Sequence, residues 1–433
     1  MHDSNTRILW QKSDNYPPTN TVFEKHTLLH TQSYMLKTLS KMNFLWKKNY
    51  IVLLSIDLSK AFDTVDTDKI LQTIIKYYTK DDKVTDWIDN FYKDRQQYTM
   101  WDNSKSELIK NYNISIVQGS SMGPKLFNIF LNDLPNASKI FETVLFADDS
   151  NFVLSNPNKK VLEKLVNREL GIIKDYFDSN GLSINISKTT FLHFCPKGEK
   201  KENLKIKLGN SELTEKEHLS FLGIEIDNKL TFKFHFKKVL EKVKKGLNGL
   251  ILTKNQLNYR SKANIYFSLI HSHLSYGALI WLGNLNKKQI KELSTIQKKA
   301  LRIIHNKKYN THTDPLFIKS NITKVENIFE KESLLLIYKY NNNSIPTDTE
   351  KLIRSNLQQT PIHTRAYENF YLKPKRGLRT GNTIYKIIES WNKHNHWILN
   401  TVRIRDFKRR INQEQNKLTP CTKINCFACN NDK

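Results

Sequence analysis

An adjacent pair of acids between two apolar runs constrains the fold of this chain more than any other feature. Asp148 and Asp149 follow the run 144–146 and precede the run 152–154. This pattern predicts two buried strands joined by a turn that carries both charges. Side-by-side carboxylates repel each other and are poorly solvated unless a cation lies between them. The pair therefore predicts a site for hard divalent cations such as Mg²⁺, which prefer oxygen ligands.

A third acid follows another apolar run. Residues 50–56 (YIVLLSI) lead directly to Asp57, and such a run is typical of a strand covered on both faces. Beside the hairpin, this strand is expected to bring Asp57 opposite Asp148, so that neighbouring carboxylates share two metal ions. The alternative is that these acids are ordinary turn or cap residues. Either segment alone favours that alternative, whereas the segments between them favour the metal site.

Five segments in order resemble the motifs of reverse transcriptases, and more narrowly those of non-LTR (jockey-like) retrotransposons. They are 57–63 (DLSKAFD), 118–124 (QGSSMGP), 146–149 (FADD), 184–189 (INISKT) and 221–223 (FLG). The resemblance covers residues 20–410 and is closest over 50–227. It implies an α+β fold: a right-hand polymerase palm, with a small antiparallel sheet and helices, followed by an α-helical thumb.

The resemblance also implies an activity, RNA-directed DNA synthesis. Its partners would be an RNA template, a DNA primer and deoxynucleoside triphosphates, and no membrane. Asp57, Asp148 and Asp149 would hold two Mg²⁺ ions, with Mn²⁺ as the alternative ion. The rival interpretations are an inactive nucleic-acid-binding remnant of such an element and a group II intron maturase-like protein.

Further site residues follow from the same resemblance. Phe62 would close the floor under the nucleotide sugar, where the alternative is an ordinary core phenylalanine. Lys188 would protonate the departing pyrophosphate, and its alternative is a solvated surface lysine. The remaining expected residues contact the nucleotide or support the primer end. The nucleotide contacts are Gln118, Gly119, Phe146 and Ala147, and the primer grip is Phe221, Leu222 and Gly223.

Positive charge is concentrated in the expected thumb. The chain has 69 Lys and Arg against 42 acids, a net charge of +27, which favours a polyanionic partner. Residues 229–340 have a helical pattern and contain 22 Lys and Arg against 6 acids. These helices are expected to grip the phosphates of a duplex. The alternative is a set of solubilising helix faces.

The two ends of the chain complete the expected domain organisation. Residues 1–48 are expected to form an arm with a remnant of the fingers, 49–227 the palm, 228–345 the thumb and 346–433 a tail. Because most of the fingers segment is not recognisable, weak nucleotide binding is expected. No apolar run reaches membrane-spanning length and no signal peptide is recognisable, so the expected location is intracellular, in nucleus and cytoplasm.

Three cysteines in the tail suggest a second metal. Cys421, Cys426 and Cys429 are one ligand short of a structural zinc site, and His394 or His396 would be the fourth ligand. The alternative is a set of free thiols in a reducing compartment.

Overall fold

The computed structural model describes residues 28–46, 48–77, 81–93, 96–102, 104–110, 114–117, 119–196, 198–200, 202–357, 383–398 and 403–417. These residues form two compact units that divide between Leu222 and Gly223. The first unit comprises the described residues from 45 to 222. The second comprises residues 28–44 and the described residues from 223 onward.

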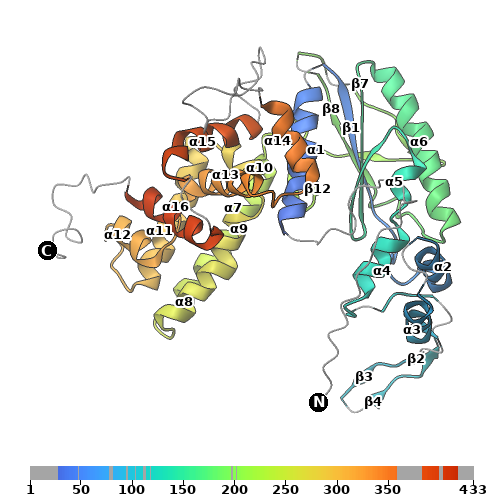
Figure 1. The fold of residues 1–433 in the computed structure, drawn as a ribbon, viewed down its shortest axis with the longest axis horizontal. Helices are drawn as coiled ribbons and strands as arrows, with labels where there is room; N and C mark the ends of the chain where they lie inside the picture. Colours follow the sequence, from blue (N-terminus) through green and yellow to red (C-terminus); the bar gives the residue numbers. More distant parts are fainter. Residues whose placement is uncertain are drawn as a thin grey trace. The chain divides into compact units, whose positions relative to one another are not determined.

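A five-stranded sheet forms the centre of the first unit (Figure 1). Its strands in spatial order are β11 (Thr214–Glu215), β8 (Thr190–Phe194), β1 (Tyr50–Ile56), β7 (Asp149–Asn156) and β6 (Glu142–Phe146). Neighbouring strands are antiparallel except β11 and β8, which are parallel. The predicted strands at 50–56 and on both sides of the acidic pair are confirmed. Residues 51–54 are fully buried, because the continuous apolar run of β1 occupies the middle of the sheet.

Helices cover one face of this sheet. Apolar side chains of α2 (Thr67–Tyr77), α4 (Gly123–Phe130) and α6 (Lys159–Ser179) share one core with Val52 and Leu54 of β1. The packing of these helices fixes the position of two loops, one after β1 and one before α4. Both loops carry expected site residues.

The short run 114–117 (ISIV) predicts a strand from its sequence, but that prediction is wrong. In the segment 114–117 only Ile114 forms an isolated bridge, and no ladder continues from it. Ser115 has a φ of +93°, which an extended ladder does not tolerate. The N–H of Ile116 instead donates to the carbonyl oxygen of Phe62 at 2.8 Å. The segment therefore tethers the loop after β1.

The first unit also contains short helices and hairpins. They are α3 (Asp82–Tyr92), β2 (Gln96–Gln97) with β5 (Ile109–Lys110), β3 (Met100–Trp101) with β4 (Ser104–Lys105), α5 (Leu134–Ala137), β9 (Lys207–Leu208) with β10 (Ser211–Glu212), and β12 (His218–Phe221).

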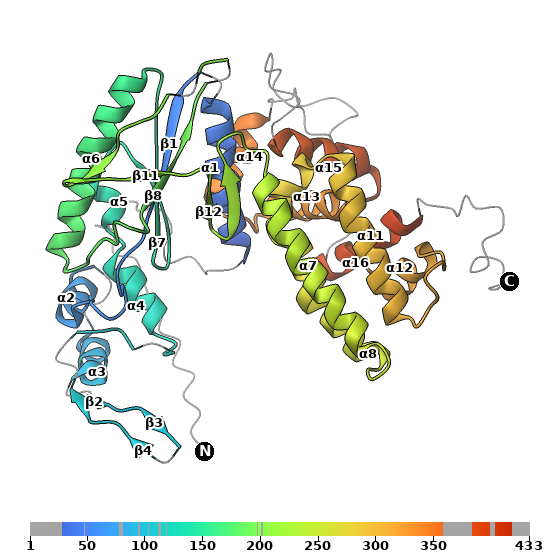
Figure 2. The ribbon, with the colours of Figure 1, turned by 180° about the vertical axis from the view of Figure 1, so that it is seen from behind.

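The second unit is almost entirely helical (Figure 2). Its elements are α1 (Leu28–Leu45), β13 (Ile224–Asp227), α7 (Lys233–Thr253), α8 (Tyr259–Tyr266), a π-helix (Phe267–His271), α9 (Ser272–Ser275), α10 (Ala278–Trp281), a 3₁₀ turn (Leu282–Asn284), α11 (Lys287–Ile304), α12 (Asp314–Ser320), α13 (Val325–Asn341), α14 (Thr347–Asn356), α15 (Thr383–Ile398) and α16 (Ile404–Lys417). The helical pattern predicted for 229–340 is confirmed. Helices α15 and α16, from the expected tail, contact α13 within the same unit. The domain limits remain predictions. Among the described helices, none combines the length and apolar character needed to cross a bilayer.

A buried glutamine ties several of these helices together. Gln297 of α11 is fully buried, and its amide donates to the Tyr266 hydroxyl and to the Thr323 carbonyl, both at 2.9 Å. Its side-chain oxygen accepts from the N–H of Val325 at 2.9 Å. Each partner is buried, so these bonds satisfy groups that water cannot reach.

Candidate active site

Strand register brings the three expected acids to one end of the sheet. In the antiparallel pairing of β1 with β7, Ile56 lies opposite Ser150. Continuing this register by one residue places Asp57 across from Asp149, rather than from Asp148 as expected. The acids come from different parts of the sequence, and the sheet is what makes them neighbours.

The turn between β6 and β7 holds the acidic pair in a constrained conformation. Phe146 pairs with Asp149, so the loop contains only two residues, Ala147 and Asp148. Ala147 has a φ of +52°, a left-handed conformation that is unusual for residues other than glycine. Two-residue hairpin loops require such values. Phe146 is partly exposed at the same turn.

Mutual repulsion affects the protonation of these carboxylates. Partial burial raises the pKa of Asp149 above its ordinary value, and the negative charges of Asp148 and then Asp57 raise that pKa further. A site that raises a carboxyl pKa by repulsion has an excess of negative charge. A bound cation would reduce the repulsion between these carboxylates.

Lys188 lies near these acids, in a turn that precedes β8. Its Nζ is 3.6 Å from Oδ2 of Asp57. Both side chains are substantially exposed, so this ion pair is weak in water. The loop is fixed by backbone contacts: the N–H of Asn185 donates to the Asp57 carbonyl at 2.8 Å, and the hydroxyl of Thr189 accepts from the Asp57 N–H at 3.3 Å. Asn185 and Thr189 were not predicted, although both lie in the motif that contains Lys188.

The carboxylate oxygens of these acids suit a hard cation, but the side chains do not surround a single point where a cation could bind. Carboxylate oxygens at the ends of adjacent strands are the ligands that Mg²⁺ prefers. As they stand, no three His, Cys, Asp or Glu side chains among the described residues are close enough together to hold a metal ion. Asp57 instead faces Lys188, and its side chain is 40% exposed.

Phe62 lies on the core below the loop that follows Asp57. Its half-buried ring stacks on Phe127 of α4, with ring centroids 4.6 Å apart and planes 23° apart. The structure therefore shows the packing expected of an ordinary core residue, on the side of the ring that faces α4. The role as a floor under the sugar stays a prediction.

The glycine-containing turn before α4 is partly described. Gly119 is exposed with a φ of +83°, and a Cβ added there would meet nothing within 4 Å. Gln118 lies outside the described residues. Gly123 was not predicted as important, yet a Cβ there would come 2.9 Å from the carbonyl oxygen of Val117. Only glycine fits this close approach, and the Ser120 hydroxyl accepts from the Gly123 N–H at 2.9 Å.

The expected primer grip lies where the two units divide. Leu222 and Gly223 form the turn after β12, with φ values of +50° and +81°. Phe221 is fully buried in the first unit. Gly223 lies in the second unit, where a Cβ would come 3.4 Å from the ring of Tyr276. The triplet is thus held mainly by packing, and its role at a primer end remains a prediction.

Most of the expected zinc ligands lie outside the described residues. They are Cys421, Cys426, Cys429 and the side chain of His396. His394 is buried, and its Nε2 lies 2.7 Å from Oε1 of Glu330. This bond occupies the ring nitrogen, so the contact within α13 and α15 accounts for His394 without a metal. The zinc site stays a prediction.

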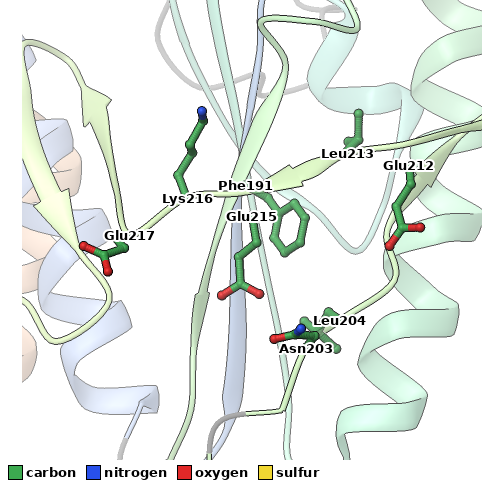
Figure 3. A pocket seen from close by; sticks show the side chains of 8 residues that line it. All are labelled: Phe191, Asn203, Leu204, Glu212, Leu213, Glu215, Lys216 and Glu217. Atoms are coloured by element: carbon green, nitrogen blue, oxygen red, sulfur yellow. The ribbon is translucent and has the colours of Figure 1, made fainter.

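A hollow of about 370 Å³ lies at the edge of the sheet beside β11 (Figure 3). Figure 3 shows carboxylates of Glu212, Glu215 and Glu217 around it, with Lys216 among them. None of the three expected catalytic acids lines it. The hollow is therefore distinct from the candidate active site.

Comparison with known proteins identifies the family. The family model described as reverse transcriptase (RNA-dependent DNA polymerase) matches residues 3–226. The chain is similar to the RNA-directed DNA polymerase from the mobile element jockey of Drosophila melanogaster, 24% identical over 273 residues, covering 59% of this chain and 28% of that protein. It is also similar to the probable RNA-directed DNA polymerase from transposon BS of Drosophila melanogaster, 25% identical, covering 64% of this chain and 32% of that protein. The type-1 retrotransposable element R1 polyprotein of Bradysia coprophila is 26% identical and matches 54% of this chain and 24% of its own length.

The chain spans less than a third of the length of these relatives. Among solved structures, telomerase from Candida tropicalis in complex with a telomeric RNA fragment is 13% identical with a TM-score of 0.34, over 90% of this chain and 52% of that one. A likeness that weak carries no argument. The family model, by contrast, covers more than half of the 433 residues, and its match shows that this chain belongs to the reverse transcriptase (RNA-dependent DNA polymerase) family.

Proposed function

We propose that this chain carries the RNA-directed DNA polymerase activity of a non-LTR retrotransposon. The observation that supports this most directly is that Asp57, Asp148 and Asp149 lie at the same end of the sheet, where β1 ends and β6 turns into β7. The substrates would be deoxynucleoside triphosphates, an RNA template and a DNA primer, in the cytoplasm and nucleus where such nucleic acids are found. The three relatives named above are proteins of mobile elements, which favours this function over a maturase.

Two divalent cations, Mg²⁺ or Mn²⁺, would supply activation of the primer 3′-hydroxyl and neutralise charge on the leaving pyrophosphate. Asp57, Asp148 and Asp149 would hold them, since their oxygens are the matching donors. This requires Asp57 to leave Lys188. Lys188 would then be free beside the site to donate a proton to the departing pyrophosphate.

Other residues would position the substrates. The exposed, left-handed Gly119 leaves its backbone open to close approach by a nucleotide. One edge of the Phe62 ring would lie under the sugar, while the face of the ring that stacks on Phe127 keeps that contact. The lysines of the helical unit would bind the phosphates of the primer–template duplex.

Primer extension on the purified chain tests this function, with Asp148→Asn as the key variant. Asparagine keeps the shape of the side chain and removes the charge that would hold a cation. Groups that stabilise charge at a reacting centre are typically worth about 100- to 1,000-fold in rate. We expect extension to fall at least about 100-fold, with duplex affinity within about twofold. Asp63→Asn, at an exposed acid in the loop after β1, is the matched control and should extend normally.

The second candidate is a nucleic-acid-binding protein without polymerase activity. The specific observation in its favour is that the three acids do not converge on one point and that Asp57 is paired with Lys188. A parent chain that binds primer–template but does not extend it with Mg²⁺ or Mn²⁺ would establish this candidate. Full extension by Asp148→Asn would contradict the two-metal assignment itself.

A further inference from the structure

One surface of the helical unit combines exposed tyrosines, cations and a buried lysine, and the polymerase site does not use it. We name it the tip surface and define it by its exposed residues Tyr259, Arg260, Lys307, Lys308 and Tyr309. Figures 1 and 2 both show the turn between α7 and α8 at the same end of this unit as the end of α11. The ring of Tyr259 lies on that of His305, with centroids 5.2 Å apart, so the two segments are in contact.

The tip surface lies in a stretch of chain nearly devoid of acids. Residues 242–313 contain 14 Lys and Arg and a single acid, Glu292. Glu292 lies 3.4 Å from Nζ of Lys244. The next acid along the chain, Asp314, is 2.8 Å from Nζ of Lys324. The cations of the tip surface therefore lie in a region of positive electrostatic potential, which attracts a polyanion.

The tip also presents aromatic rings to solvent. Tyr309 is 89% exposed and Tyr259 is 47% exposed. An exposed ring flanked by cations is the combination that single-stranded nucleic acids use, because bases stack on the ring while phosphates meet the cations. A duplex cannot use these rings in the same way, since its base faces are already stacked.

A buried cation lies beneath these residues. Lys262 of α8 is only 1% exposed, and its Nζ bonds the side-chain oxygen of Asn306 at 2.6 Å. That partner is a neutral amide, and among the described residues no carboxylate forms an ion pair with Lys262. A buried charge without a counter-charge is costly to the fold. A phosphate bound near the exposed Asn306 would supply the missing negative charge.

Part of this arrangement has a structural explanation. Asn306 is in the left-handed conformation just after α11, and the N–H of Lys307 donates to the Arg302 carbonyl at 2.8 Å, as in a Schellman motif. The ammonium of Lys262 near that helix end also suits the helix dipole. Neither effect accounts for the exposed Tyr309 or for the neighbouring Lys307 and Lys308.

We propose that the tip surface binds a single-stranded nucleic-acid segment. Tyr259 and Tyr309 stack on unpaired bases, and Arg260, Lys307 and Lys308 bind the phosphates, with Lys262 adding its charge from below. The tip surface belongs to the second unit and includes none of the three candidate catalytic acids, so its binding can be measured without polymerase activity. It would hold an unpaired part of a template or of a displaced strand.

The first test measures binding of the whole chain to labelled oligonucleotides, in the Asp148→Asn background so that no extension occurs. The probes are an unstructured RNA, a DNA of the same sequence and a blunt duplex. We expect Tyr259→Ala with Tyr309→Ala to weaken single-strand binding about tenfold or more, and duplex binding less than about twofold. The matched control, Tyr259→Phe with Tyr309→Phe, keeps both rings and should bind as the parent does.

The outcomes separate clearly. Loss with RNA, with DNA or with both, but not with the duplex, supports the proposal and identifies the strand. Unchanged affinity for both single strands overturns it, and so does an equal loss with the duplex. Because only binding is measured, a chain that lacks polymerase activity still gives a decisive result.

The second test examines the cations. Lys307→Gln with Lys308→Gln should reduce the slope of log affinity against log salt by about 1.4 for a single strand, whereas Lys164→Gln on α6 should leave it unchanged. Lys262→Met should weaken single-strand binding at least about fivefold while thermal stability is kept or raised. A less stable Lys262→Met chain with parental affinity would contradict the role given to Lys262.

Discussion

At the scale of single residues, Asp57 and Phe62 each have one contact in the structure and a second, proposed contact with a cation or a substrate. Asp57 faces Lys188 now and would face a cation in the active state. Phe62 has one face on Phe127, and in the proposed function its edge would lie under the nucleotide sugar. Such dual roles explain why packing alone does not establish the function of either residue.

Phe62 gives the sharpest prediction at this scale. Phe62→Ala should raise incorporation of ribonucleotides relative to deoxynucleotides about tenfold or more, because the truncated side chain leaves room for a 2′-hydroxyl. The selectivity of one methylene-sized contact is typically about 10- to 200-fold. Primer extension with each nucleotide, reported as a ratio of kcat/KM values, measures this.

The same variant removes a stacked ring and should also lose stability, so a packing control is needed. Phe127→Leu perturbs the fully buried partner of the stack without touching the nucleotide. We expect it to lower stability by about 1 kcal/mol and to leave the sugar preference unchanged. If both variants relax the sugar preference, Phe62 is only a core residue.

At the scale of helices and strands, the second unit is held by polar contacts buried among its helices. Gln297 links α11 to the end of α8 and to the segment that leads into α13. His235 of α7 is buried and His271 of the π-helix is partly buried, with His235 edge-on to Trp281 at 5.0 Å between centroids. The unit is therefore sensitive to changes that apolar helices would tolerate.

Gln297→Leu should destabilise the chain by about 3 kcal/mol. The change leaves the buried hydroxyl of Tyr266 and the N–H of Val325 without a partner, and each such group costs about 1–3 kcal/mol. Denaturant unfolding measures the effect. Gln256→Leu, at an exposed position after α7, is the matched control and should change stability by less than about 0.5 kcal/mol. Equal effects of the two variants would contradict the network.

Acid should weaken the helical unit through its buried histidines. Burial, followed by the charge of Lys238, lowers the pKa of His235 from 6.5 to about 4, and burial followed by the charge of Lys331 does the same for His271. Because both pKa values are lower in the folded chain than in the unfolded chain, their stabilisation is complete above pH 6.5 and is lost as the pH falls toward 4. Between pH 7 and pH 5 each histidine should account for about 2 kcal/mol.

The test compares the free energy of unfolding at these two pH values. We expect His271→Gln to lose about 2 kcal/mol less on acidification than the parent chain. His218→Gln, at a partly exposed histidine of the first unit, serves as the control and should lose as much as the parent. An unaltered pH dependence in His271→Gln would mean that this histidine is not buried in solution.

At the scale of the whole molecule, charge is distributed unevenly. Residues 229–340 carry a net +16 of the total +27. The first unit holds the acids of the candidate site and the second holds most of the net positive charge, a division suited to catalysis in one part and phosphate binding in another.

Duplex binding should therefore depend steeply on salt, chiefly through the second unit. Replacing the exposed Lys242 and Lys245 of α7 by Gln should reduce the slope of log affinity against log salt by about 1.8, because each lysine that no longer neutralises a phosphate lowers the slope by about 0.9. The control replaces the exposed Lys160 and Lys164 of α6 and should leave the slope unchanged. Titrations of a primer–template duplex at several salt concentrations measure both. Equal slopes in the two variants would place the duplex elsewhere.

The sequence by itself determined the local elements of the first unit. The run 50–56 had to form a covered strand, and the acidic pair between apolar runs had to form a tight turn, because burial and turn chemistry act within a few residues. The five ordered motifs also indicated the family, since each motif is a short run of neighbouring residues. Helix α6 and its end at Asn180 and Gly181 are local in the same way, because apolar periodicity and a glycine after the cap lie within one segment.

Only the tertiary structure decided what those elements bring together. The register that sets Asp57 across from Asp149, and the turn that sets Lys188 against Asp57, join residues about 90 and 130 positions apart in the chain. The failure of the predicted strand at 114–117 has the same origin, since its N–H groups bond to the loop after β1 instead of to a neighbouring strand. Contacts over such separations depend on packing between elements, and no pattern within one segment records them.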